Sequence, residues 1–389
     1  MRLLILGCGL AGSAMAWAAH RRGWSIALID RVDLESSSHV AAGLVTPITG
    51  TRSAATWRWD SFYAAACHHY TRVERDTHSS FWHPQPALRL FHSEEERSRA
   101  QERWQRTDPA DHSPWSPKIR LCHSEELAGL HAPHGGCWME PAARLHTGSY
   151  LAKTRAYFQS RDEFFVADID IDSQLAVPTN PSTEPLQLRL PSGPISVDAV
   201  VFCQGFEAKC NSWFSALPLH PARGDILTLA AENKEAVSGA SSPFRSGSTL
   251  PELCRTHVVH SEVWMVPADR QNVLVGATYD RHHLHGRVDE DGPARTNREI
   301  LLERVQRMLP AVNVQQWPVA RHQAAVRPAS YDRHPLIGRH PTVHNAYVLN
   351  GLGSKGTLMA PLLAEQLCDA LLYDRPIDSM LEWSRRVLP

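Results

Sequence analysis

Three glycines near the start of the chain, and one acid after them, have the spacing of a dinucleotide-binding turn. Gly7, Gly9 and Gly12 form the pattern G-x-G-x-x-G. In such a turn the first glycine permits a tight bend, the second lets the backbone approach a pyrophosphate, and the third allows a helix to pack closely on a strand. Asp30 could accept hydrogen bonds from ribose hydroxyls and would disfavour a 2′-phosphate. The pattern therefore predicts redox chemistry with NAD or FAD, and not with NADP.

The elements expected around this turn have the order that such a site needs. Residues 3–6 indicate a buried strand, residues 13–22 an alanine-rich helix and residues 25–30 a second strand. The helix would direct its N-terminal N–H groups and positive dipole end towards the pyrophosphate. Two other interpretations are weaker, namely a glycine turn in another kind of α/β unit and a signal peptide. A signal peptide is disfavoured because glycines interrupt the apolar stretch and Arg21 and Arg22 lie on its wrong side.

Composition limits the remaining classes of protein. The 389 residues are 43% hydrophobic and 21% charged, which is typical of globular chains and excludes disordered, collagen and coiled-coil classes. With 40 basic and 41 acidic side chains, no strong overall field favours nucleic acid or an anionic membrane. No apolar run reaches the roughly 18–20 residues that span a bilayer, so no membrane association is expected. The eight cysteines form no C-x-x-C pair, which favours reduced thiols and a cytoplasmic location.

The residues after the second expected strand favour FAD over NAD. A simple NAD dehydrogenase would continue with regular βαβ units, whereas residues 36–47 read SSSHVAAGLVTP, whose small side chains suit backbone that passes close to a flat ring system. This segment resembles the flavin-lining segment of the FAD-dependent oxidoreductases of the D-amino-acid-oxidase superfamily. Glycine oxidase, sarcosine oxidase and the flavin domain of the bifunctional bacterial enzyme that modifies the wobble uridine of tRNA belong to that superfamily.

The resemblance continues, in order, to the C-terminus. Residues 196–205 (SVDAVVFCQG) match the strand that returns to the cofactor in this superfamily. Further matching segments are LPLHPARG at 217–224, VWMVP at 263–267, VLVGAT at 273–278, VRPASYDRHPLIG at 326–338 and NGLGSKG at 350–356. The chain is therefore identified by resemblance as a member of this superfamily.

The resemblance implies a fold class of α/β plus α+β. A discontinuous Rossmann-like FAD-binding domain is expected beside a substrate domain with an antiparallel sheet. The FAD-binding domain is expected at residues 1–60, 140–215 and 320–389, and the substrate-binding domain at residues 61–139 and 216–319. Residues 229–256 are polar and serine-rich and are expected to form a mobile connection or lid.

The same resemblance implies which residues hold FAD. Ser354 and Lys355 fall at a glycine-rich helix start, where backbone N–H groups and a nearby lysine would stabilise negative charge on the reduced flavin. No cysteine lies between Cys254 and Cys368, the region in which some relatives tether the flavin, so non-covalent FAD is expected. The expected cofactor-binding residues are Gly7, Gly9, Leu10, Ala11, Gly12, Asp30, Arg31, Ser37, Ser38, Ala42, Gly43, Leu44, Asp170, Gly205, Arg327, Gly351, Gly353, Ser354, Lys355, Gly356 and Thr357.

The expected catalytic residues are Arg327, Trp264 and Tyr279. By resemblance, Arg327 binds the substrate carboxylate through a bidentate fork, which the planar guanidinium suits. The alternative is a structural arginine that holds the neighbouring loop through Asp332. Trp264 and Tyr279 fall where the superfamily places side chains over the flavin or the substrate, although an aromatic residue in a strand is also an ordinary core residue.

Histidines offer weaker candidates. His39 lies beside the flavin-lining segment and could face the ring system. His282, His283 and His285 could suggest a metal site, but the chain has no second cluster at ligand spacing, so no metal is expected.

Three functions stay open. The first is oxidation of a C–N bond in a small amine or amino acid, in which a hydride moves to flavin N5, the imine is hydrolysed to an oxo acid, and oxygen or another acceptor reoxidises the flavin. The second is removal of a carboxymethyl group from the wobble uridine of tRNA, which the GSKG segment and arginines between residues 58 and 106 favour. A solvated helix face also explains those arginines, and the near-zero net charge ranks tRNA second. The third is a non-catalytic flavoprotein scaffold.

Overall fold

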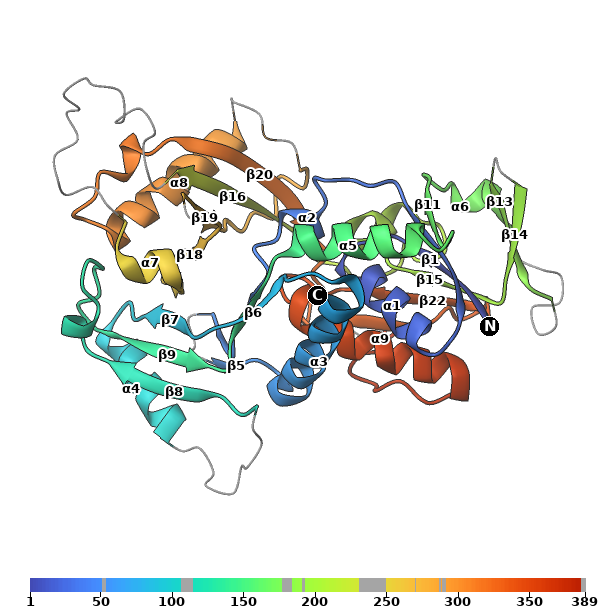
Figure 1. Cartoon of the computed structure of the whole chain (residues 1–389), viewed down its shortest axis with the longest axis horizontal. Helices are drawn as coiled ribbons and strands as arrows, with labels where there is room; N and C mark the ends of the chain where they lie inside the picture. The colour runs from blue at the N-terminus through green and yellow to red at the C-terminus, as the bar shows by residue number, and fades with distance from the viewer. Residues whose placement is uncertain are drawn as a thin grey trace.

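The computed structural model describes residues 1–50, 54–105, 115–176, 184–190, 193–230, 250–269, 271–286, 288 and 292–385. These residues form two large sheets with their covering helices, one towards either end of an elongated molecule (Figure 1).

The six-stranded sheet is built around the N-terminal strand. Its order is β11 (Phe164–Val166), β2 (Ser25–Asp30), β1 (Arg2–Leu6), β15 (Ala199–Phe202), β22 (Ala346–Asn350) and β21 (Leu336–Arg339), with all neighbours parallel except β21 and β22. Strand β1 is buried on both faces, as an apolar strand of a parallel sheet should be. Successive side chains point to opposite faces, so Leu3 and Ile5 join one core and Leu4 and Leu6 join the other.

Helices cover one face of this sheet and a short β-meander covers the other. The helical layer consists of α1 (Leu10–Arg21), α3 (Trp59–Thr77), α5 (Thr147–Gln159) and α9 (Gly356–Tyr373), in which both α1 and α3 pack against α9 (Figure 1). The meander consists of β12 (Leu175–Ala176), β13 (Leu186–Leu190) and β14 (Gly193–Val197). In a sheet covered on both faces in this way, ligands bind outside the carboxyl ends of the strands.

The eight-stranded sheet forms the other end of the molecule (Figure 1). Its order is β20 (Val319–Arg327), β16 (Ala222–Ala230), β19 (Asn272–Gly276), β18 (Trp264–Pro267), β17 (Val258–His260), β7 (Ala87–Leu90), β9 (Gly136–Glu140) and β8 (Lys118–Cys122). Its strands are antiparallel except for the pair β17 and β7. Helix α8 (Pro293–Met308) contributes Leu301 and Val305 to one core of this sheet, and α4 (Glu94–Gln105) contributes Ala100 to another.

Short elements join the two ends. Strands β3 (Leu44–Val45), β10 (Ala143–Leu145) and β6 (Trp82–Pro84) form one small sheet, and β4 (Ile48–Thr49) pairs with β5 (Ala54–Ala55). The short helix α2 (Ser37–Val40) packs against β20. The segment expected to line the flavin therefore runs from the six-stranded sheet towards the eight-stranded sheet.

The expected fold class is confirmed, and the strand, helix and strand predicted at the N-terminus are β1, α1 and β2. Two placements differ from the expected domain ranges. Strand β20 belongs to the eight-stranded sheet, so a boundary at residue 320 would divide that sheet. Helix α3 packs with the cofactor half because its apolar face continues the core around α1 and α9. Residues 231–249 of the expected connection, and Arg106, lie outside the described residues.

No helix within the described residues is both long enough and apolar enough to cross a membrane.

Candidate active site

A cleft lies at the carboxyl ends of β1, β2 and β15. It is a cavity of about 290 Å³, lined by the glycine turn and by residues 35–39, 167–169 and 203–207. Gly7 begins the turn with φ of +97°, a backbone conformation that residues other than glycine rarely adopt. Its N–H donates to the Ile29 carbonyl at 2.8 Å, which ties the turn to β2.

Close contacts account for the other two glycines of the turn. A Cβ on Gly12 would overlap the Gly7 carbonyl oxygen, so only glycine lets α1 pack this close to the turn. A Cβ on Gly9 would lie 2.7 Å from Ser38 Oγ, which also accepts the N–H of Leu10 at 3.0 Å. Ala11 follows in the first turn of α1 and is half-buried. The N-terminus of α1 therefore already engages a hydroxyl oxygen, at the point where the sequence predicts phosphate oxygens.

Asp30 ends β2 and lines the cleft. Its two carboxylate oxygens accept the N–H groups of Cys8 and Val32, each at 2.5 Å. The carboxylate thus fastens the glycine turn to β2, in addition to the ribose contact predicted for it. Its neighbour Arg31 pairs instead with Asp33 and Glu207.

The expected flavin-lining segment takes a sharp turn between the sheets. Ser37 lines the cleft and Ala42 is buried. Gly43 has φ of +72°, and a Cβ there would overlap the Leu145 carbonyl oxygen. Leu44 then enters β3 and is half-buried. The need for a small residue at position 43 is therefore a backbone packing requirement.

Two other expected cofactor residues lie on the rim formed by β11 and β15. Gly205 lines the cleft with φ of +58°, and its carbonyl accepts the Asn350 side-chain amide at 2.8 Å. Asp170 follows the lining residues 167–169, but it is exposed and its carboxylate accepts the Ser173 hydroxyl at 2.6 Å.

The glycine-rich segment before α9 brings that helix next to α1. Gly351 and Gly353 have φ of +71° and +54°. Gly356 packs closely against Leu10. A Cβ at position 356 would lie only 3.1 Å from the Leu10 side chain. Thr357 is buried in the first turn of α9. The N-termini of α1 and α9 therefore lie side by side.

Lys355 adds a positive charge at the start of α9, beside the exposed Ser354. Its Nζ donates to Thr56 Oγ1 at 3.4 Å. Burial lowers the pKa of Lys355, and the positive charge of Arg333 lowers it further. Among the described residues no carboxylate lies within ion-pair distance of Lys355, so its charge is available to an anionic ligand.

Arg327 ends β20 and turns across the neighbouring strand. A Cβ on Gly224 would overlap the Arg327 guanidinium, so this glycine makes room for it. One terminal nitrogen, Nη1, donates to the carbonyls of Thr278 at 3.2 Å and Arg223 at 3.5 Å. Within the described ranges, neither Nε nor Nη2 has a hydrogen-bond partner, and no carboxylate lies within ion-pair distance. Burial lowers the pKa of Arg327, and the side chain is a half-buried cation whose Nε and Nη2 are unpaired within the described residues.

Asp332, the alternative partner of Arg327, forms an ion pair with another arginine. Asp332 pairs with Arg385, which donates to both of its carboxylate oxygens at 2.7 and 2.9 Å. Burial alone would raise the pKa of Asp332, but the hydrogen bonds from Arg385 and from the His334 N–H outweigh burial and lower the pKa to about 2. The structural interpretation of Arg327 through Asp332 is therefore wrong.

The two expected aromatic residues differ in burial. The Trp264 ring lies over Gly276, where a Cβ would be 2.5 Å from the ring, and it packs near Val40 of α2. Tyr279 is 58% exposed, and the Arg327 Cζ lies 5.9 Å from the centre of its ring. Trp264 therefore forms part of the apolar wall between the sheets, whereas Tyr279 stands at the outer side of Arg327.

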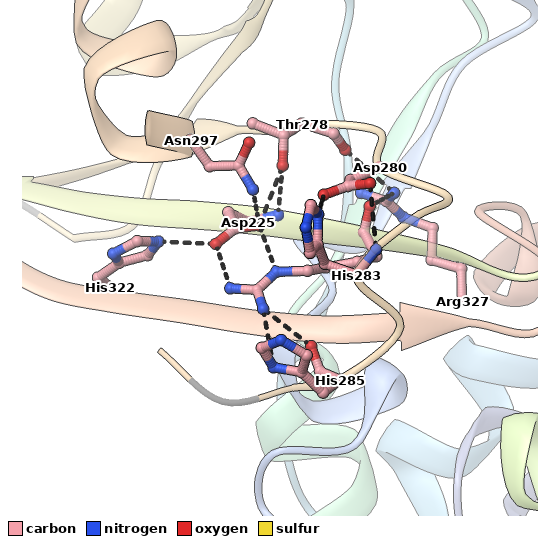
Figure 2. Close-up of polar contacts among 9 residues, drawn as sticks. Asp225, Thr278, Asp280, His283, His285, Asn297, His322 and Arg327 are labelled. Atoms are coloured by element: carbon pink, nitrogen blue, oxygen red, sulfur yellow. Dashed lines mark hydrogen bonds and ion pairs between the residues drawn. The ribbon is translucent and has the colours of Figure 1, made fainter. Parts of the chain in front are cut away.

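A buried polar network beside Arg327 was not predicted (Figure 2). Arg223 and Asp225 on β16 are fully buried and pair at 2.9 Å. Asp225 also accepts hydrogen bonds from the Thr278 hydroxyl at 3.1 Å, the Asn297 amide at 2.9 Å and His322 Nε2 at 2.9 Å. These partners follow Asp225 by 53, 72 and 97 positions, so only Arg223, within the LPLHPARG segment, and Thr278, within the VLVGAT segment, gave a sequence signal.

The histidines singled out in the sequence bind neighbouring side chains. His39 lines the cleft, with its ring nitrogens 2.9 Å from Ser36 Oγ and 3.0 Å from an Arg155 nitrogen. Burial lowers the pKa of His39, and Arg155 lowers it further. His283 pairs with Asp280 at 2.8 Å. Across the described residues, no group of three or more His, Cys, Asp or Glu side chains is arranged to hold a metal ion.

A glycine turn at the carboxyl edge of a largely parallel sheet, beside a second, largely antiparallel sheet, defines a dinucleotide-dependent oxidoreductase. The chain belongs to the DAO family of FAD-dependent oxidoreductases, whose model matches residues 2–370. The cleft and glycine turn fit FAD, which is the cofactor of this family. The chain is therefore a flavin oxidoreductase.

Among curated proteins, the chain is similar to the tRNA 5-methylaminomethyl-2-thiouridine biosynthesis bifunctional protein MnmC of two bacteria. Identity to the Marinobacter nauticus protein is 23% over 384 residues, covering 95% of this chain and 55% of that protein. Identity to the Hahella chejuensis protein is 24% over 407 residues, covering 99% and 59%. The chain thus spans just over half the length of these relatives.

Solved structures share the fold across the whole chain. Iminodiacetate oxidase from Chelativorans sp. BNC1 has a TM-score of 0.70 at 19% identity, covering 98% of this chain and 99% of that one. Glycine oxidase from Geobacillus kaustophilus has a TM-score of 0.70 at 17% identity, covering 99% of each chain. At these identities the likeness shows the fold alone.

Proposed function

We propose that this enzyme oxidises a C–N bond of a small amine or amino acid that carries a carboxylate. The observation that carries the proposal is Arg327, a half-buried cation that no described carboxylate neutralises. Its Nε and Nη2 edge has the geometry of a fork for a carboxylate. Because this guanidinium is partly removed from water and has no acidic partner among the described residues, an anionic ligand would stabilise it.

The residues of the chain position the substrate, and the cofactor supplies the redox chemistry. Arg327 binds the carboxylate, and Trp264 limits the space on the apolar side. Residues 7–12 and 36–44, Asp30 and the N-terminus of α9 hold FAD, without a covalent bond. When bound, FAD would supply the redox chemistry by accepting a hydride, which is a proton with two electrons, from the carbon beside the amine. The imine product then takes up water and gives an oxo acid and a smaller amine or ammonia.

Anaerobic titration tests this function directly. Glycine, sarcosine, proline and D-amino acids are each mixed with the FAD-loaded enzyme, and absorbance near the flavin band is followed. Bleaching by at least one of them, lost in Arg327→Ala, is the expected result. Absence of bleaching with every small amine and with tRNA would contradict the proposal and leave a flavoprotein scaffold. Oxygen uptake in the same reactions tests oxygen as the acceptor, against a quinone or a carrier protein.

A second candidate places the same carboxymethylamine on tRNA. The rim outside Arg327 favours it, because exposed aromatic rings alternate there with cations. The Tyr331 ring stacks on His220 with centres 4.3 Å apart, and Arg281 lies over the Tyr279 ring and donates to its hydroxyl. Such rims can stack bases and attract phosphates. The names of the MnmC relatives agree with this candidate, whereas the net charge of −1 does not.

Undermodified tRNA separates the two candidates. Fast flavin reduction by tRNA, falling steeply as salt is added, would rank tRNA above free amines, because phosphate contacts release counterions. Reduction by a free amine alone, independent of salt, would remove tRNA. We propose a cytoplasmic location for either reaction, because all eight cysteines are free thiols and six of them are buried.

A further inference from the structure

We propose that Asp225 and Thr278 are positioning residues for Arg327, and that the buried pair of Asp225 with Arg223 keeps Arg327 free to bind a carboxylate. This inference rests on the proposed function. It concerns the network drawn in Figure 2, which joins β16, β20, α8 and the segment after β19.

The first step is the grip of Asp225 on Thr278. The Thr278 hydroxyl accepts the Asp225 N–H at 2.9 Å and donates to Asp225 Oδ2 at 3.1 Å. These two bonds use the hydroxyl as both acceptor and donor, so they fix the Thr278 side chain. Asp225 is 0% exposed and Thr278 is 5% exposed, so water cannot replace either partner in these two hydrogen bonds. The backbone of Thr278 is therefore held against β16.

The second step leads from Thr278 to the substrate arginine. The Thr278 carbonyl accepts Arg327 Nη1 at 3.2 Å. The Arg223 carbonyl accepts the same nitrogen at 3.5 Å. Both acceptors belong to residues of the network, so the network decides where Nη1 lies. Because the guanidinium is planar and rigid, a fixed Nη1 also fixes the direction of the Nε and Nη2 edge.

The third step concerns charge. Asp225 favours the charged form of Arg327, yet its own oxygens are occupied. Arg223 donates to both of them at 2.9 Å, and the Thr278, Asn297 and His322 side chains supply further bonds. A carboxylate with this many partners has no lone pair left for a second arginine. Arg223 thus neutralises Asp225, and Arg327 keeps its charge for a ligand.

The same arginine also holds the segment that runs from Tyr279 to the cofactor cleft. Arg223 Nη1 donates to the His285 carbonyl at 3.0 Å and lies 3.2 Å from His285 Nδ1. Gly286, the next residue, lines the cofactor cleft. The network therefore touches both the substrate arginine and the border of the cofactor site.

The test measures carboxylate binding rather than turnover. Glycolate and its neutral counterpart glycolamide are titrated into the FAD-loaded enzyme by calorimetry. Glycolate is the probe because it contains the carboxymethyl group common to both candidate substrates. Thr278→Val removes the hydroxyl and keeps the shape, and Thr278→Ser restores the hydroxyl. Thr154→Val is the matched control, because Thr154 is a fully buried threonine whose hydroxyl accepts Trp17 Nε1 in the cofactor half.

The expected result is a pattern across variants and probes. Thr278→Val removes both hydrogen bonds of the hydroxyl and weakens glycolate binding about fivefold to tenfold, about the free energy of one hydrogen bond, and leaves any glycolamide binding unchanged. Thr278→Ser and Thr154→Val bind glycolate like the unmodified enzyme. In an Arg327→Lys background, Thr278→Val has no further effect, because the fork that it orients is gone. Asp225→Asn, where it folds, weakens glycolate in the same direction.

Any other outcome contradicts either the positioning role of Thr278 or the carboxylate site at Arg327. Equal glycolate affinity in Thr278→Val and the unmodified enzyme, with Arg327→Ala weakened, overturns the positioning role alone. Equal losses for Thr278→Val and Thr278→Ser, or for glycolate and glycolamide, do the same, since they indicate general damage. Glycolate binding that Arg327→Ala leaves unchanged, or no binding by the unmodified enzyme, overturns the carboxylate site itself and with it this inference.

Discussion

In the cofactor cleft the groups that face the ligand site come mainly from the backbone, whereas in the eight-stranded sheet they come from side chains. Gly7, Gly9 and Gly12 act by having no side chain, and Asp30 binds main-chain N–H groups. Beside Arg327, by contrast, Asp225 is surrounded by five side-chain bonds. The comparison teaches that one half depends on steric space near the chain start and the other on a long-range polar network.

The largest effect is expected from a single methyl group in the cofactor half. Gly12→Ala should leave purified protein with almost no FAD, because the new Cβ overlaps the Gly7 carbonyl oxygen. Helix propensity alone would predict that this change stabilises the helix by about 1 kcal/mol. A loss of FAD would therefore come from the overlap and not from a weaker helix. FAD is measured by absorbance of the flavin released on denaturation.

The matched control is Gly148→Ala, also within a helix. A Cβ at Gly148 meets only the His146 side chain at 3.9 Å, an ordinary contact. This variant should keep its FAD. A Gly12→Ala protein with as much FAD as Gly148→Ala would show that backbone space at the turn does not govern cofactor binding, and the comparison of the two halves would fail.

The same contrast explains how much the sequence alone could predict. The turn, its strands and the acid at residue 30 lie within 30 consecutive positions, so local spacing was enough to place them. Arg327 and Trp264 came from motif resemblance, which gave their type but not the free edge of the arginine or the packing over Gly276. Asp225 could not be linked to His322, 97 positions later, because only the pairing of β16 with β20 brings them together.

The next largest effect concerns the substrate half. Under the proposed function, Arg327→Ala removes a charge-assisted pair with the substrate carboxylate of about 1.5–3 kcal/mol, so kcat/KM should fall about 10- to 150-fold. The kcat/KM of Arg327→Lys should lie between the values of Arg327→Ala and the unmodified enzyme, since lysine keeps the charge and loses the fork. The control is Arg321→Ala, an exposed arginine on the same strand. An unchanged kcat/KM in Arg327→Ala would remove this residue from the site.

Acid should weaken the polar network. Burial alone would raise the pKa of Asp225, but the hydrogen bonds from Arg223 and His322 outweigh it and lower the pKa to about 2. A depressed carboxyl pKa stabilises the fold above the unfolded value of about 4, and this stability is lost as pH falls towards 2. The loss should be about 1 kcal/mol at pH 3, out of about 2.5 kcal/mol in total below pH 2, measured as the urea midpoint at pH 7, 4 and 3.

Two variants, Asp225→Asn and Asp332→Asn, test whether Asp225 causes the loss of stability in acid. Asp225→Asn should be less stable at neutral pH, because Arg223 is left buried without an acid, and should lose less stability than the unmodified protein between pH 4 and 3. Asp332→Asn alters a partly exposed pair with Arg385 in the cofactor half, so its effect should be smaller. Equal acid sensitivity in Asp225→Asn and the unmodified protein would assign the acid response to other carboxyls.

The smallest effect is expected at Asp30, where the two halves of the comparison meet in one residue. Its carboxylate fastens the glycine turn through Cys8 and Val32, and it is also the predicted acceptor for the adenosine ribose. Asp30→Ala should raise the dissociation constant of the apoprotein for FAD about fivefold to tenfold, the effect of about 1 kcal/mol. FMN separates the two roles, because it carries a phosphate but no adenosine. A loss confined to FAD indicates the ribose contact, an equal loss for FMN indicates that the turn itself has moved, and unchanged affinity for both would mean that Asp30 serves neither. Since backbone N–H groups and the Ser38 hydroxyl remain at the turn, we expect the larger share of the loss to be specific to FAD.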